Sequence, residues 1–277
     1  MAATSKLNFG KNTKTVSVTS GKGGVGKTTL IANVAYALAS RNKRVLIFDG
    51  DLGMANVDIM FGAKVDGHIL DVLQGEKNIS EIITPLASNI SLISGGSGIV
   101  ELNRLNAFER RALLDSVCEL EYLYDYLLID TAPGISDNVL YLNAAAQIAT
   151  VVITPDPSSF ADSYALIKVL NRDFKKSNFA IVCNQVRDEI EGLSLFNRFS
   201  EVVNRFLYIG LDYWGAIPTD QLFKKSTQNQ RLIMRHELQS VSHQYLLNIS
   251  MKLEKSLADL DSKSGLNYFW EQVVGVA

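Results

Sequence analysis

The sequence has few cysteines and no pairing pattern among them. Cys118 and Cys183 are the only two in 277 residues, and each lies in an apolar stretch. Because no Cys-x-x-Cys motif occurs, the sequence argues against a cysteine-ligated iron–sulfur cluster. Isolated thiols of this kind are typical of small core residues in a reducing compartment.

Long apolar runs and an excess of charge are also missing. No run approaches the ~18 apolar residues of a membrane-spanning helix. The first fifteen residues are polar, without the apolar centre of a signal peptide. The formal net charge of −2 offers no general attraction for nucleic acid, so we do not expect direct nucleic-acid binding. We therefore expect a cytoplasmic protein.

What the sequence does contain is a regular alternation of strands and helices. With 47% hydrophobic and 20% charged residues, it has ample core for one α/β domain. The alternation predicts a doubly wound, mostly parallel sheet of about seven or eight strands, with helices on both faces and ligands beyond the carboxyl ends of the strands. We place Pro85 and the other prolines in loops or near strand ends. The candidate strands are residues 15–19, 44–49, 90–94, 126–130, 150–154, 179–184 and 212–217, and the candidate helices are 27–40, 106–120, 137–146, 159–173, 193–206 and 235–261.

A glycine-rich segment between the first strand and the first helix carries the strongest chemical signal. It reads Ser-Gly-Lys-Gly-Gly-Val-Gly-Lys-Thr-Thr and matches the phosphate-loop pattern G-x-x-x-x-G-K-[ST]. Glycines allow backbone N–H groups to turn toward phosphates, Lys27 reaches the β- and γ-phosphates, and the Thr28 hydroxyl faces magnesium. The sequence therefore predicts a nucleoside triphosphate site formed by Gly21, Lys22, Gly23, Gly24, Val25, Gly26, Lys27, Thr28 and Thr29.

Aspartates follow two other buried strands. Asp49 and Asp51 end one strand, and Asp130 ends another. In a parallel sheet these carboxylates emerge at the same edge as the phosphate loop, where Mg²⁺ or its waters would satisfy them. We assign Thr28, Asp49 and Asp130 to the metal. For Asp51, the alternative of a helix cap or turn former is almost as good.

The second lysine of the loop, Lys22, marks a resemblance to the "deviant" phosphate loop of the MinD/ParA class of ATPases. Residues 49–62 (Asp-Gly-Asp-Leu-Gly-Met-Ala-Asn-Val-Asp-Ile-Met-Phe-Gly) and 130–137 (Asp-Thr-Ala-Pro-Gly-Ile-Ser-Asp) resemble the two switch segments of that class. The sequences of these two segments are most similar to those of the flagellar-number regulators FlhG, also called FleN or YlxH. The resemblance extends from about residue 15 to the carboxyl terminus.

The resemblance implies roles for individual residues. Lys22 would reach across a face-to-face homodimer to the partner's phosphates, with ATP between the subunits, and Asp51 would orient the attacking water. Lys22 and Asp51 are thus the candidate catalytic residues. Asn184, Pro218 and Asp220 lie in the two segments that would face adenine. Taken alone, an asparagine after a strand is more often a turn residue.

The carboxyl-terminal segment carries an apolar stripe at helical spacing, formed by Leu266, Phe269, Trp270, Val273 and Val274. One interpretation is a last helix docked on its own domain. The resemblance implies another, an amphipathic membrane anchor, although Glu271 departs from the usual basic pattern. We divide the chain into a flexible segment 1–14, an ATPase domain 15–262 and this segment, 263–277.

The resemblance implies a cytoplasmic ATPase that switches between a monomer and an ATP-bound dimer, reversibly associates with the inner face of the cell membrane and controls flagellar number or placement. Partners would include an FlhF-type GTPase, a flagellar transcription regulator or switch-complex proteins. The first fifteen residues lack the Asp-Gln motif thought to stimulate that GTPase. Three alternatives remain: a MinD- or ParA-type positioning ATPase for division sites, chromosomes or cargo, a metabolic enzyme with the same core, and a nucleotide-gated scaffold whose hydrolysis is negligible.

Overall fold

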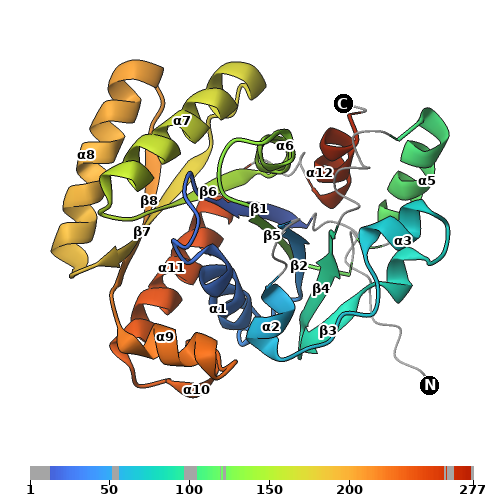
Figure 1. Cartoon of the computed structure of the whole chain (residues 1–277), viewed down its shortest axis with the longest axis horizontal. Coiled ribbons are helices and arrows are strands. Elements are labelled where there is room, and N and C mark those ends of the chain that lie inside the picture. Colours follow the sequence, from blue (N-terminus) through green and yellow to red (C-terminus); the bar gives the residue numbers. More distant parts are fainter. Residues whose placement is uncertain are drawn as a thin grey trace.

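The computed structural model describes residues 13–51, 56–96, 105–118, 120, 123–258, 260 and 265–275. In this part of the chain, eight strands form one sheet in the order β3-β4-β2-β5-β1-β6-β7-β8 (Figure 1). Every neighbouring pair is parallel except β3 with β4. The strands are β1 (Lys14–Thr19), β2 (Val45–Gly50), β3 (Thr84–Ala87), β4 (Ile90–Ser94), β5 (Tyr126–Thr131), β6 (Ile148–Ile153), β7 (Phe179–Val186) and β8 (Leu211–Pro218).

Helices cover both faces of the sheet (Figure 1). One face carries α1 (Lys27–Ala39), α10 (Ile233–His236) and α11 (Val241–Ala258). The other carries α5 (Ala107–Cys118), α6 (Asp137–Ala145), α7 (Pro157–Phe174), α8 (Glu189–Leu207) and α12 (Leu266–Val273). Short helices complete the connections: α2 (Val57–Phe61), α3 (Ile69–Leu73), the 3₁₀ helix η1 (Ile79–Glu81) and α9 (Gln221–Gln228).

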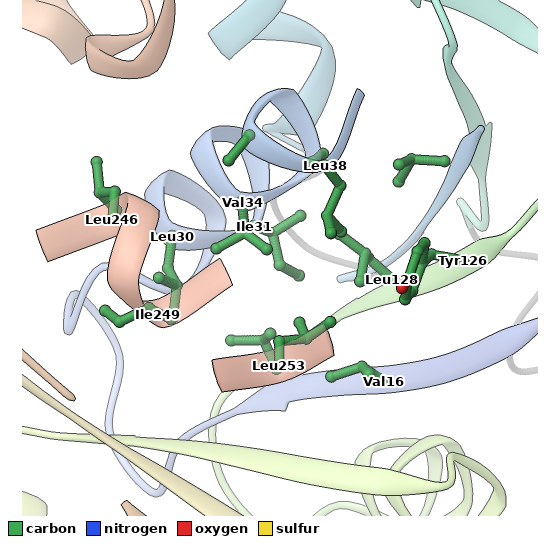
Figure 2. Packing of buried hydrophobic residues seen from close by; sticks show 14 of the residues in the cluster. Val16, Leu30, Ile31, Val34, Leu38, Tyr126, Leu128, Leu246, Ile249 and Leu253 are labelled. Atoms are coloured by element: carbon green, nitrogen blue, oxygen red, sulfur yellow. The ribbon is translucent and has the colours of Figure 1, made fainter. Parts of the chain in front are cut away.

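The core follows from the alternation of side chains along the strands. On β2, Val45 and Ile47 belong to the core on the α1 side, whereas Leu46 and Phe48 belong to the core on the opposite face. Burial on both faces explains why such strands are apolar throughout. Figure 2 shows α1 and α11 side by side on this face of the sheet, packed through Leu30, Ile31, Val34, Leu38, Leu246, Ile249, Leu253, Val16 and Leu128.

All seven predicted strands occur, with ends that differ by at most two residues. The prediction missed β3, an antiparallel edge strand in which Pro85 is the second residue, near the strand end, where a missing N–H is tolerated. It also missed α2, α3 and α9. The long helix predicted over 235–261 is instead α10 and α11.

The folded domain begins earlier than predicted. Thr13 is buried and donates its hydroxyl to the Tyr124 carbonyl at 2.9 Å, and β1 starts at Lys14. The predicted boundary after residue 14 is therefore misplaced. Residues 1–12 lie outside the described residues.

The carboxyl-terminal helix α12 is docked on the domain. All five residues of its apolar stripe are buried in the core beside α5 and α6. The Trp270 ring lies 5.2 Å from that of Phe48 and 5.5 Å from that of Phe269, both edge to face. The described part of the segment predicted over 263–277, residues 265–275, is thus packed on the same core, and the docked interpretation describes this structure. No helix among the described residues is long and apolar enough to cross a membrane.

Candidate functional site

The phosphate loop joins β1 to α1 at the carboxyl edge of the sheet. Gly24 and Gly26 have φ angles of 75° and 93°, in the left-handed region that glycine adopts without strain. Gly21 is required for another reason: a Cβ there would lie 2.2 Å from the Asp162 carbonyl carbon of α7. The loop is thus shaped by its own glycines and by the close approach of α7.

Lys27 begins α1 and lies buried in the loop, with 8% of its surface exposed. Its Nζ donates to Ser20 Oγ at 3.2 Å. Burial lowers the pKa of Lys27, while the charges of Asp130 and Asp51 act to raise it. A buried cation next to backbone N–H groups is suited to the terminal phosphates of a nucleotide.

Two buried aspartates stand side by side near Lys27. Asp49 on β2 pairs in register with Asp130 on β5, and both are almost fully buried. Burial raises the pKa of Asp130 to about 7 and that of Asp49 to about 6. Thr28 Oγ1 donates to Asp130 Oδ2 at 2.6 Å, and the hydrogen bond opposes the rise for Asp130.

These residues fit a magnesium ion. Asp130 Oδ1 is buried without a hydrogen-bond partner among the described residues, so one carboxylate oxygen has capacity for a cation or its water. Both oxygens of Asp49 already accept hydrogen bonds, one from the backbone N–H of Asp51 at 3.2 Å and the other from that of Val57 at 3.3 Å. Asp49 therefore also anchors the segment that follows β2.

Lys22 is held by the start of α7. Its Nζ lies 2.5 Å from Asp156 Oδ2 and 2.9 Å from Ser158 Oγ, both at the start of α7. Lys22 and Asp156 are each nearly half-exposed, at 43% and 44%. Asp51 lies close enough for its charge to act on Lys27 and Asp130.

The segment after β5 contacts the phosphate loop. Thr131 Oγ1 donates to the Val18 carbonyl at 3.1 Å, and the Gly134 N–H donates to the Ser20 carbonyl at 2.9 Å. A Cβ on Gly23 would lie 3.7 Å from Pro133 of the same segment. Pro133 and Gly134 therefore lie directly against the phosphate loop.

The predicted adenine-facing residues already have partners. Asn184 Nδ2 donates to the Val25 carbonyl at 2.7 Å, so this amide braces the phosphate loop. Asp220 accepts from the Leu222 N–H at 2.9 Å and from Ser242 Oγ at 2.5 Å, which makes it a cap for α9. Pro218 ends β8 and pairs in register with Val186 on β7, while Asn184 pairs with Ile217.

The sequence interpretation missed several residues that shape this site. Gln185 Nε2 donates to the Gly24 carbonyl at 3.2 Å, and Ser163 Oγ accepts from the Gly21 N–H at 3.4 Å. Asp156 and Ser158, which hold Lys22, were also missed. The order Asp-Pro-Ser, typical of a capped helix start, was the one available signal for Asp156.

Comparisons with known proteins agree with this geometry. A family model described as an AAA domain matches residues 13–181. The chain is 32% identical to the antiactivator FleN of Pseudomonas aeruginosa, with 94% of this chain and 92% of FleN covered. It is 33% identical to the flagellum site-determining protein YlxH of Helicobacter pylori, with 95% and 90% covered.

Solved structures show the same fold. A chain of the MinC:MinD cell division protein complex of Aquifex aeolicus matches with a TM-score of 0.69 at 25% identity, covering 87% of this chain and 96% of that one. MinD of Pyrococcus horikoshii complexed with Mg-ADP matches with a TM-score of 0.68 at 23% identity, with 88% and 97% covered. The chain belongs to the MinD/ParA family of ATPases, whose phosphate loop carries a second lysine.

Proposed function

We propose that this chain is an FlhG-like ATPase that dimerises on binding ATP and thereby controls the number or placement of flagella. The observation that carries the proposal is the position of Lys22. The loop already has Lys27 for its own phosphates, and the Lys22 side chain is 43% exposed. Once released from Asp156, such a cation is available to the phosphates of a facing subunit.

Within each subunit, Lys27 and Thr28 would serve the bound nucleotide. Asp130, through its unpartnered Oδ1, and Asp49 would hold the waters of Mg²⁺. The ion would neutralise charge on the phosphates. Pro218 and Asn184 remain our candidates for the adenine side, with Asp220 placed to hold the loop between them and α9.

Asp51 would orient the water that attacks the γ-phosphate. Residues 49–62 and 130–137 contain no glutamate and no arginine, so neither switch supplies a strong base or an arginine finger. Hydrolysis without a partner should therefore be well below the ~1–100 s⁻¹ typical of kinases. A slow rate suits a timed switch, in which a partner sets the lifetime of the dimer.

The flagellar role rests on the likeness to FleN and YlxH along nearly the whole chain. Their names describe an antiactivator and a flagellum site-determining protein. A flagellar transcription regulator, an FlhF-type GTPase or switch-complex proteins are the partners that this role would require. A MinD-like role in division-site placement is the second candidate, favoured by the fold shared with the MinC:MinD complex.

Membrane association would require α12 to leave the core. Its five apolar side chains are buried, so the docked protein has no anchor to offer. We propose that release of α12 accompanies ATP-driven dimerisation, because two weak anchors on one dimer gain avidity. The ATP dimer would then lie on the inner face of the membrane, while the monomer stays in the cytoplasm.

The test is replacement of the chromosomal gene in the source organism by a Lys22→Ala version, followed by counting flagella in electron micrographs. We expect the number or position of flagella to change as it does on deletion. Normal flagellation combined with misplaced division septa would instead support the MinD-like role.

A further inference from the structure

A hollow of about 470 Å³ opens at the amino-terminal edge of the sheet, which is the edge opposite the phosphate loop. It lies where α6 and α7 end, before β6 and β7 begin, and one residue of α12 reaches it. Its size is within the range of about 300–1,000 Å³ of pockets that hold small molecules. We call it the α6–α7 hollow, and its polar lining is Gln147, Lys175, Lys176, Ser177, Asn178 and Tyr268.

Lys176 is a buried cation in the wall of this hollow. Only 9% of the residue is exposed, and its Nζ donates to the carbonyls of Ala146 and Gln147 at the end of α6. These carbonyls carry partial negative charge, but Lys176 forms no ion pair with any described residue. Burial still lowers the pKa of Lys176 to about 7. An ammonium group has three protons, so one donor of Lys176 is left for an anion.

The rest of the polar lining has the same preference. No aspartate or glutamate is among the described residues that line the hollow. Lys175 is exposed, and its only described partner is the Arg172 carbonyl, which accepts from Nζ at 2.9 Å. Ser177 and Asn178 are exposed and offer side-chain donors. Asp212 lines the adjoining hollow under β8 but not this one. Cations and donors without a carboxylate favour an anionic ligand.

Apolar surface lies beside the two lysines. Phe174 at the end of α7 is half-buried, and its ring lies 5.6 Å from that of Tyr141, edge to face. Tyr268 on α12 is 42% exposed. Both rings line the hollow together with Ala144 and Leu260. A ligand that fills the hollow therefore needs an apolar body as well as an anionic group.

We propose that the α6–α7 hollow binds a small organic anion, with its anionic group on Lys175 and Lys176 and its apolar body against Phe174 and Tyr268. Because Tyr268 belongs to α12 and the lysines follow α7, the ligand joins α12 to the rest of the domain and stabilises the docked helix. No residue that we place at the nucleotide lines the hollow. The proposal is therefore independent of the ATPase assignment.

The test titrates the full chain with sodium benzoate at pH 7.5 by isothermal titration calorimetry, with and without saturating Mg-ADP. We expect saturable binding that Mg-ADP does not change, because the phosphate loop lies at the opposite edge of the sheet. Phenyl phosphate, titrated with Mg-ADP present, shows whether the hollow prefers a phosphate to a carboxylate. Benzamide, the neutral analogue of benzoate, should bind about tenfold more weakly or less tightly still.

Substitutions locate the binding. Lys176→Met should weaken benzoate binding about tenfold or more, because a charged hydrogen bond is lost. The matched control is Lys168→Met, an exposed lysine of α7 outside the hollow, which should leave the affinity unchanged. Lys175→Met changes an exposed side chain and should weaken binding a few-fold, so it tests the site even if Lys176→Met does not fold. Circular dichroism melting checks the fold of each variant.

Proton uptake distinguishes a ligand site from a lysine that only closes the end of α6. Lys175, Lys176 and Tyr268 are the titratable residues that line the hollow, and α6 contributes none. At pH 7.5 part of Lys176 is unprotonated, and a bound anion favours the protonated form. Calorimetry in two buffers should show proton uptake with benzoate in the wild type and not in Lys176→Met. Hydrogen exchange of α12 should also slow when benzoate is bound.

Four results would overturn the proposal. The first is no binding of benzoate or phenyl phosphate at tens of millimolar, and the second is equal binding of benzamide. The third is displacement of benzoate by Mg-ADP, which would place it in the phosphate loop. The fourth concerns Asp259 and Asp261, the sequence neighbours of Leu260, which lie outside the described residues. Binding only in the double variant Asp259→Asn, Asp261→Asn would mean that the chain's own carboxylate occupies the hollow.

Discussion

Lys22 Nζ lies 2.5 Å from Asp156 Oδ2 of the same chain. Asp156 is also the N-cap of α7, because its other oxygen accepts from the Ser158 N–H at 2.8 Å. The hydrogen bond from Lys22, followed by those from Ser158, lowers the pKa of Asp156 to about 2, so this carboxylate stays ionised at neutral pH. Dimerisation through Lys22 must therefore exchange an internal ion pair for the phosphates of the facing subunit.

Asp156→Asn should favour the ATP-bound dimer. Asparagine keeps the cap of α7 but no longer holds Lys22 as an ion pair, so the lysine is released at lower cost. Analytical ultracentrifugation with ATP should show a dimer at a protein concentration a few-fold lower than for the wild type. Ser158→Ala, which removes the hydroxyl contacts to Lys22 and Asp156 but leaves the ion pair, is the matched control. A weaker dimer for Asp156→Asn would contradict the competition.

Binding of Mg²⁺ and nucleotide should strengthen as pH rises from about 5.5 to 8. The pKa of Asp130 is raised to about 7 and that of Asp49 to about 6, so both carboxyl groups keep their protons to a higher pH than usual. A metal site needs both carboxylates ionised, so metal binding must release these protons. The same shifts make the nucleotide-free protein lose stability as pH rises from about 4 to about 7, because in that interval the folded state binds more protons on these two carboxylates than the unfolded state does.

Calorimetry in two buffers of different ionisation enthalpy, near pH 6.5, measures the protons released on binding. We expect net release in the wild type and less in Asp130→Asn, which retains an oxygen to accept from Thr28. Proton uptake on binding would contradict the assignment of these aspartates to the metal.

Asp51→Ala should block hydrolysis while sparing nucleotide binding. Removing the carboxylate removes the group that orients water, whereas Lys27 and Thr28 remain. Single-turnover assays with radiolabelled ATP should show a rate at least about 100-fold lower, as for loss of a general base. Lys27→Ala is the contrasting variant and should lose triphosphate binding itself. Hydrolysis at the wild-type rate in Asp51→Ala would remove this residue from the mechanism.

Trp270→Ala tests how α12 is held. The indole is 1% exposed and packs on Phe48, so the change should cost about 3–5 kcal/mol in free energy of unfolding. Urea unfolding followed by circular dichroism measures the loss, and Tyr268→Ala on the exposed side of α12 serves as the control. Unchanged stability together with lost liposome sedimentation would identify α12 as an anchor that adds nothing to the core.

The sequence alone predicted the place of a residue in the fold where one physical rule links its type to that place. Parallel strands bring their carboxyl ends to one edge, so Asp49 and Asp130 could be placed beside the phosphate loop before their register was known. Strand β3 could not be predicted, because its four residues, which include Pro85, show no clear hydrophobic pattern.

Contacts between distant segments could not be predicted. Periodicity gives α12 an apolar stripe but does not say whether protein or lipid covers it. Asn184 looked suited to a purine edge, yet its amide lies against Val25, a residue 159 positions away. The contact of Lys22 could not be predicted for the same reason, because its partner Asp156 is 134 positions away in the sequence.

The central claim is that ATP joins two subunits through Lys22, and the most direct test is the molar mass in solution with each nucleotide. Size-exclusion chromatography with light scattering should give the 30.5 kDa monomer with Mg-ADP and twice that mass with Mg-ATP in the Asp51→Ala background. Adding Lys22→Ala should return the ATP sample to the monomer while nucleotide binding persists. An ATP-dependent dimer that survives Lys22→Ala would contradict the account.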